Sequence, residues 1–74
     1  MGATYSADQI IGKTLVARKN VELKRLPTDT APAVYTVKPG QTVGVVYSYL
    51  LPKAGRENLY WQFVDANNNY FYAA

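Results

Sequence analysis

Residues 38–51, KPGQTVGVVYSYLL, join a turn signal to a long apolar segment. Proline at the second position and glycine at the third position of 38–41 favour a type II turn, because only a residue without Cβ adopts positive φ at little cost. Residues 42–51 are rich in β-branched and aromatic side chains, which predicts a long strand. Gly44 within this strand predicts a bend or a close approach of backbones, as in a strongly curved sheet.

Strand patterns continue on both sides of this segment. Residues 14–24 alternate with a period of two, and Lys19 and Asn20 predict a turn or bulge that divides them. The other predicted strands are 33–37 (AVYTV), 59–64 (LYWQFV) and 70–72 (YFY). The segments between them, 26–32, 52–57 and 65–69, are rich in residues that favour turns and loops.

The fold class predicted by this pattern is all-β. About five strands at spacings near ten residues, in a chain of 74 residues, predict a small SH3-like barrel. Ser6-Ala7-Asp8-Gln9 has the form of a capping box and leads into Ile10-Ile11, so residues 6–11 predict one short N-terminal helical turn that ends at Gly12. We expect the odd-numbered side chains from Leu15 through Phe63 to form the core.

Length and composition limit the possible functions. The chain has room for one domain, residues 1–74, in which residues 1–13 form an N-terminal extension. It contains no cysteine and no histidine, which excludes disulfides, thiolate ligands and imidazole chemistry. Its carboxylates are scattered without the pairing that acid and base catalysis needs. We therefore expect no enzyme activity, no cofactor, no metal ion and no membrane partner.

Basic residues concentrate in one part of the chain, whose formal net charge is +3. The residues in question are Lys13, Arg18, Lys19, Lys24 and Arg25, against one acidic residue, Glu22, in the same stretch. Such an excess attracts anionic partners, or it forms a solvated face that discourages aggregation through strand edges. The sequence leaves both interpretations open.

Tyrosine is the residue type in clear excess, with seven tyrosines in the chain. The candidate ligand-binding residues are Tyr47, Tyr49, Tyr60, Trp61 and Tyr70, which fall in strands that would neighbour one another in a small barrel. Core packing is the alternative role, because aromatic rings supply much of the buried area of a small domain. A core of this size cannot enclose ten aromatic side chains, so we expect part of the set to be exposed.

Four pieces of the sequence together resemble a bacterial SH3 domain. They are residues 21–27 (VELKRLP), residues 33–37 (AVYTV), residues 39–45 (PGQTVGV), and Trp61 with Val64. This family has a small SH3-like barrel and occurs in cell-wall hydrolases, phage lysins and many other bacterial proteins. The chain departs from the family at its end, where residues 67–72 (NNNYFY) replace the usual Gly-Trp-Val-like strand. The resemblance implies a barrel that holds peptides or cell-wall fragments on exposed aromatic residues.

The expected function is a non-catalytic binding or targeting module of a bacterial or phage protein. Its partner would be a peptide, a protein or peptidoglycan, and the module would be a monomer or a weak oligomer. As part of a longer exported protein it would act in the cell envelope or outside the cell. Two alternatives remain: a small basic barrel that binds nucleic acid, which the modest charge disfavours, and a structural or assembly domain.

Overall fold

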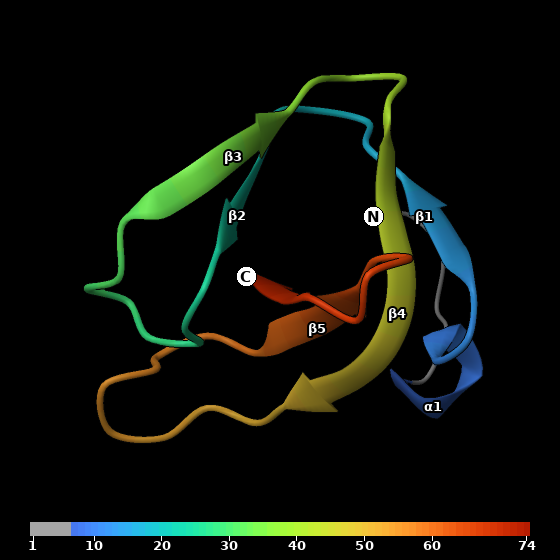
Figure 1. Cartoon of the computed structure of the whole chain (residues 1–74). Coiled ribbons are helices and arrows are strands. Elements are labelled where there is room, and N and C mark those ends of the chain that lie inside the picture. The colour runs from blue at the N-terminus through green and yellow to red at the C-terminus, as the bar shows by residue number, and fades with distance from the viewer. Residues whose placement is uncertain (1–6) are drawn as a thin grey trace.

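The computed structural model describes residues 7–74, which form one short helix and a six-stranded antiparallel sheet (Figure 1). The elements are α1 (Ala7–Ile10), β1 (Thr14–Val16), β2 (Val21–Lys24), β3 (Ala33–Val37), β4 (Thr42–Leu50), β5 (Tyr60–Val64) and β6 (Tyr70–Ala73). The prediction of an all-β chain with one helical turn is confirmed. Ser6, the predicted capping residue of that turn, lies outside the described residues.

The strand order in the sheet is β1-β4-β5-β6-β2-β3. Strands β4, β5 and β6 form a meander, and β2 joins β6 through the pair Lys24 and Tyr72. The β2–β3 hairpin and the β1–β4 pair lie on opposite sides of the view, with β5 between them (Figure 1). Strands β1 and β3 are the two ends of the order, so hydrogen bonds do not close the sheet.

Residues 14–24 form two strands with different partners, so the sheet has six strands instead of about five. Strand β1 pairs with β4, whereas β2 pairs with β3 and β6. Between them, Ala17 exchanges backbone hydrogen bonds of 2.9 and 2.8 Å with Gln41 and Gly40. The predicted break at Lys19 and Asn20 therefore separates two strands that contribute to different parts of the sheet.

The turn at residues 38–41 and the bend at Gly44 both follow the prediction. Gly40 has a φ of 87°, and the amide of Gln41 donates a 3.0 Å hydrogen bond to the carbonyl of Lys38, as a type II turn requires. Gly44 has a φ of 148°, and a Cβ at this position would lie 3.6 Å from the Cβ of Phe63. Because 3.6 Å is an ordinary contact distance, the positive φ, and not a lack of space, is what favours glycine at this position.

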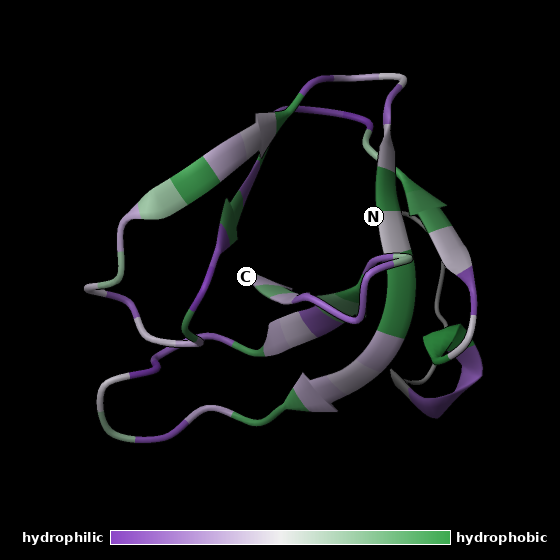
Figure 2. Cartoon of the chain, viewed as in Figure 1, coloured by the Kyte–Doolittle hydropathy of each residue, from purple (hydrophilic) through white to green (hydrophobic). Residues whose placement is uncertain are grey.

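The core lies on the inner face of the curled sheet and beneath α1. Its buried members are Ile10, Leu23, Val46, Phe63, Phe71 and Ala73. Figure 2 shows that hydrophobic residues concentrate in the strands, that α1 is partly hydrophilic and partly hydrophobic, and that the connecting loops are mostly hydrophilic. Since Val46 lies opposite Phe63 and Phe63 opposite Phe71, these three side chains share one face of the β4–β6 meander.

The expectation that odd-numbered side chains form the core is wrong at Tyr35 in β3, which is 61% exposed, and in the middle of β4, although the odd-numbered Val43 does pack against the core. Val45 is 38% exposed and Tyr47 is 54% exposed, whereas Val46 is 1% exposed. A β-bulge between Val46 and Ser48 inserts one extra residue into β4. Because a bulge shifts the alternation by one, Val46 faces inward before it and Tyr49 shares a face with Trp61 after it.

Candidate functional site

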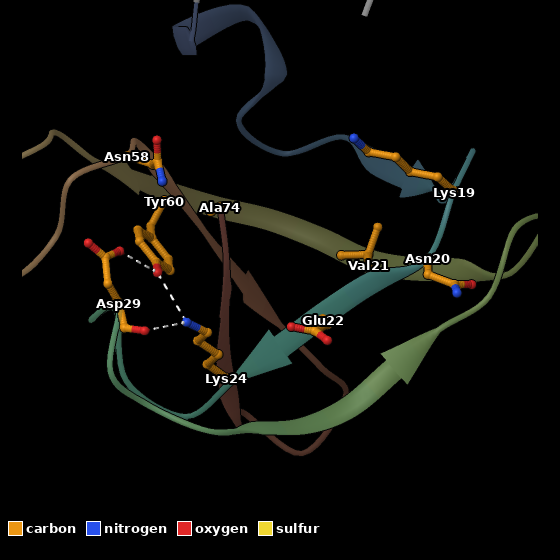
Figure 3. Close-up of a pocket in the computed structure, with 9 residues that line it drawn as sticks. All are labelled: Lys19, Asn20, Val21, Glu22, Lys24, Asp29, Asn58, Tyr60 and Ala74. Carbon is orange, nitrogen blue, oxygen red and sulfur yellow. Dashed lines mark hydrogen bonds between the residues drawn. The ribbon is translucent and has the colours of Figure 1, made fainter.

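Two adjoining hollows lie where β2 begins and β6 ends. The polar hollow, of about 560 Å³, is lined by Lys19, Asn20, Val21, Glu22, Lys24, Asp29, Asn58, Tyr60 and Ala74 (Figure 3). The apolar hollow, of about 670 Å³, has walls of Ile10, Leu15, Val21, Val43, Trp61, Phe63 and Ala73 and a rim that includes Lys13, Arg18 and Lys19. Lys19, Val21 and Ala74 line both hollows, so the two meet.

One wall of the polar hollow is a hydrogen-bonded network around Asp29. Its carboxylate accepts hydrogen bonds from the backbone amide of Glu57 at 2.7 Å and from the hydroxyl of Tyr60 at 2.9 Å. The ammonium group of Lys24 lies 3.3 Å from the same hydroxyl, and it donates to the carbonyl oxygens of Thr28 and Asp29 (Figure 3). These contacts fix the Tyr60 hydroxyl between an anion and a cation.

The charge of Asp29 follows from this geometry. The Glu57 amide lowers the pKa of the Asp29 carboxyl below its ordinary value, and the Tyr60 hydroxyl and the Lys24 and Arg56 charges add to the effect. Hydrogen bonds to an ionised carboxylate favour its charged form. Asp29 is therefore an anion at neutral pH, and both of its carboxylate oxygens accept hydrogen bonds from other residues of the protein.

Two loops build this wall. The amide of Asp29 donates to the carbonyl of Gly55 at 3.0 Å, which ties the loop after β2 to the loop after β4. Tyr60 begins β5 beneath both loops and is only 2% exposed. Asp29 was not among the predicted site residues. Its position two residues after Pro27 marked it as a loop residue, but its partners lie 28 and 31 residues further along the chain.

The apolar hollow opens onto the inner face of β5. Trp61 is half-buried and packs against the core, as do Leu15, Val21 and Val43. The ring of Tyr49 meets Trp61 edge-on, with centroids 6.1 Å apart. The hydroxyl of Tyr49 donates a 3.2 Å hydrogen bond to Asp8, which raises the pKa of this phenol. Tyr49 thus connects Trp61 to α1: its ring packs against the indole and its hydroxyl bonds to Asp8.

The structure places the five predicted ligand-binding residues in three separate locations. Tyr47 and Tyr70 form an exposed pair with ring centroids 5.3 Å apart. Tyr49 and Trp61 form the inner pair at the apolar hollow, and Tyr60 belongs to the wall of the polar hollow. Tyr60 is not part of an exposed aromatic surface, because the two loops cover its ring and Asp29 accepts from its hydroxyl.

Residues 7–74 contain no group of three His, Cys, Asp or Glu side chains that could hold a metal ion. Asp65 caps the β5–β6 turn by accepting from the amides of Asn67 and Asn69, and the Asn69 amide is the main reason that its pKa is lowered. Within the described part of the chain, no helix is long and apolar enough to cross a membrane.

The fold and the hollows define an all-β chain with a two-part surface groove. Comparisons of the sequence with protein-family models, with curated proteins and with solved structures find no match in any of the three.

Proposed function

We propose that the chain is a non-catalytic binding module that holds an extended peptide segment of a partner protein in the two joined hollows. The observation that carries this proposal is the shared lining at Lys19, Val21 and Ala74, which makes one groove from a polar half and an apolar half. An extended peptide offers backbone amides and side chains of both kinds along its length. Sites that bind small ligands are likewise apolar with a few convergent polar groups.

The polar half supplies hydrogen-bonding groups on a rigid support. Asn20 and Asn58 carry amides that can donate to and accept from a peptide backbone, and Glu22 adds an acceptor. Asp29, Lys24 and Tyr60 are held by one another, so little conformational freedom remains to be lost on binding. Such preorganisation favours affinity without requiring a large interface.

We also propose that the fold is an SH3-like barrel of the bacterial SH3 type. Two features support this: a Pro-Gly turn leading into a long, bent strand, and six antiparallel strands curled around one core. The helix α1 and strand β1 lie outside the part of the sequence that resembles the family. A bacterial or phage origin belongs to the same proposal.

The proposal is tested by selecting peptides from a random dodecapeptide display library on the immobilised chain. Selected peptides are then titrated against the free chain, with the fluorescence of Trp61, the sole tryptophan, as the signal. Replacing Asn20 or Asn58 by Ala should each weaken binding about three- to tenfold, the usual worth of one hydrogen bond. Asn67→Ala, an exposed amide in the β5–β6 turn, is the matched control. Failure to select any peptide, or equal losses for all three variants, would contradict the proposal.

The tyrosine pair is a second candidate surface, for peptidoglycan or for a second copy of the chain. Tyr47 is 54% exposed and Tyr70 is 39% exposed, and the exposed Val45 lies on the same strand as Tyr47. Paired aromatic rings bury much area at small entropic cost, so they suit either partner. The test is retention on purified peptidoglycan and sedimentation at high concentration, with the double variant Tyr47→Ser, Tyr70→Ser. Tyr35→Ser, an exposed tyrosine on β3, is the control.

A further inference from the structure

We propose that the groove captures the C-terminal end of its peptide: an apolar last side chain enters the apolar hollow, and the terminal carboxylate meets the basic rim. This inference rests on the proposed function, because it names the class of peptide that the groove would accept. It is carried by the juxtaposition of an apolar hollow with three basic side chains that have no partner among residues 7–74. Those residues are called the rim group below: Lys13, Arg18 and Lys19.

The apolar hollow has the size and walls for one or two apolar side chains. Its volume of about 670 Å³ falls within the range of small-ligand sites, about 300–1,000 Å³. Its apolar lining includes Trp61 of β5, Val43 of β4, Leu15 of β1 and Val21 of β2. These four side chains are only half-buried. An apolar ligand group would therefore cover apolar surface that is exposed to water in the free chain.

The side chains of the rim group are exposed and bind no other side chain within residues 7–74. The structure gives Lys13, Arg18 and Lys19 no side-chain hydrogen bond, ion pair or ring contact with any described residue. No Asp or Glu side chain among the described residues lines the apolar hollow. Two acidic side chains on neighbouring elements lie elsewhere: Asp8 accepts from Tyr49, and Glu22 lines the polar hollow. The complement of this arrangement is an apolar group that carries a negative charge.

A peptide C-terminus carries these two groups on one residue. Its side chain and its carboxylate share a Cα, so both can be placed where the hollow meets the rim. Lys19 lines both hollows, and the residues that precede the end can therefore continue into the polar hollow. Charged hydrogen bonds from Lys and Arg to a carboxylate are about twice as strong as neutral ones. A segment from the middle of a chain could bring an anion to the rim only on an Asp or Glu side chain, which is a different residue from the one that fills the hollow.

The test compares one peptide in two forms: an acetylated hexapeptide of four serines and two C-terminal leucines, as the free acid and as the C-terminal amide. Titrations follow Trp61 fluorescence at low and physiological salt. We expect the free acid to bind about tenfold more tightly than the amide, and raised salt to reduce this preference. As a control, the protein itself is extended by Gly-Ser after Ala74, so that its own C-terminal carboxylate lies further from the hollow. The extended protein should show the same preference for the free-acid peptide over the amide.

Charge variants show where the preference arises. The triple change Lys13→Gln, Arg18→Gln, Lys19→Gln should remove the preference for the free acid and leave the weaker binding of the amide. The double change Lys38→Gln, Lys53→Gln removes exposed lysines elsewhere and should leave the preference intact. Octanoate and octylammonium serve as probes of the same hollow without a peptide backbone.

The possible results separate the inference from the proposed function. Equal binding of acid and amide would overturn the inference while the peptide groove stands. The inference also fails if octanoate binds as tightly as the acid peptide and Asn20→Ala weakens neither, since the ligand would then be a fatty-acid-like amphiphile. If neither hexapeptide form binds but library peptides do, only the inference falls. If no peptide of either kind binds, both fall.

Discussion

The molecule contains two groups of three basic residues that differ in what the fold does with their charges. In the engaged group each charge has an internal partner: Lys24 bonds to Tyr60, Arg25 lies 5.0 Å from the Phe71 ring, and Arg56 donates two hydrogen bonds to the Leu51 carbonyl. The rim group, Lys13, Arg18 and Lys19, has no such partner in the described residues. The two groups overlap in sequence, since five of the six residues lie between positions 13 and 25.

This difference shows that basic residues close together in the sequence can have different roles in the folded protein. A cation whose hydrogen bonds hold two loops together would have to break those bonds to bind a ligand, which would loosen the loops. A cation at the edge of an apolar hollow that has no internal partner can bind a ligand without any loss of interactions within the fold. We therefore expect the engaged group to determine stability and the rim group to determine binding.

The largest effect on stability is expected from Arg56→Ala. The Arg56 side chain is 9% exposed, and its guanidinium donates hydrogen bonds of 3.0 and 2.8 Å to the carbonyl of Leu51. Removing a charged, largely buried donor should lower the free energy of unfolding by about 2–3 kcal/mol. Urea unfolding measures the change. Lys53→Ala, an exposed residue in the same loop, is the control and should cost less than about 0.5 kcal/mol; similar losses for both would remove the distinction.

A smaller loss is expected from Tyr60→Phe. The change keeps the buried ring but deletes the hydroxyl that donates to Asp29 and accepts from Lys24. The free energy of unfolding should fall by about 1 kcal/mol, the net worth of a typical hydrogen bond. Tyr47→Phe removes a hydroxyl from an exposed ring and should leave stability unchanged within error. If both variants unfold at the same urea concentration as the parent chain, the engaged network does not stabilise the fold.

The acid dependence of stability sharpens the comparison further. The folded pKa values of Asp29 and Asp65 lie below the ordinary value of 3.8, so the unfolded chain binds protons at higher pH than the folded chain does. The stabilisation is fully present above that value and is lost as pH falls through the lower folded pKa values. Urea unfolding between pH 6 and pH 2.5 should show this loss. Asp29→Asn should make the profile flatter, because it removes one of the two carboxyl groups whose pKa is lowered by folding.

The smallest effect on stability is expected from the triple rim variant, Lys13→Gln, Arg18→Gln, Lys19→Gln. These side chains have no internal partners among the described residues, so the free energy of unfolding should change by less than about 0.5 kcal/mol. Thermal and urea unfolding give the value directly. A loss as large as that of Arg56→Ala would mean that the rim group supports the fold, and the contrast between the two groups would be wrong.

The local elements of the fold were predictable because they depend on neighbouring residues. The strand predicted at residues 33–37 is β3, and the turn predicted at 38–41 has Gly40 at positive φ. The short helix was predicted from its capping pattern. Each depends on backbone preferences within a few residues, which the side chains of those residues set directly. The SH3-like barrel and the binding function remain predictions.

The parts that sequence reasoning missed depend on contacts between distant segments. Val45 and Tyr47 face outward, against the alternation expected for β4, because the register of β4 shifts at Val43 against β1 and at Tyr47 against β5. Asp29 was not expected at the site because its partners are distant in the sequence: Glu57 lies in the loop between β4 and β5, and Tyr60 begins β5. Neither feature leaves a signal in the nearby sequence, since a register shift or a loop contact is decided by the segment opposite.

By itself the sequence determined the class of structure, the positions of most strands and turns, and an excess of aromatic and basic side chains. Only the tertiary structure decided which of those side chains lie together: Trp61 with the rim group, Tyr60 with Asp29, and Tyr47 with Tyr70. The physical reason is the range of the forces involved. Backbone preferences act over a few residues, whereas burial and charge pairing are settled by strands that meet from far apart in the chain.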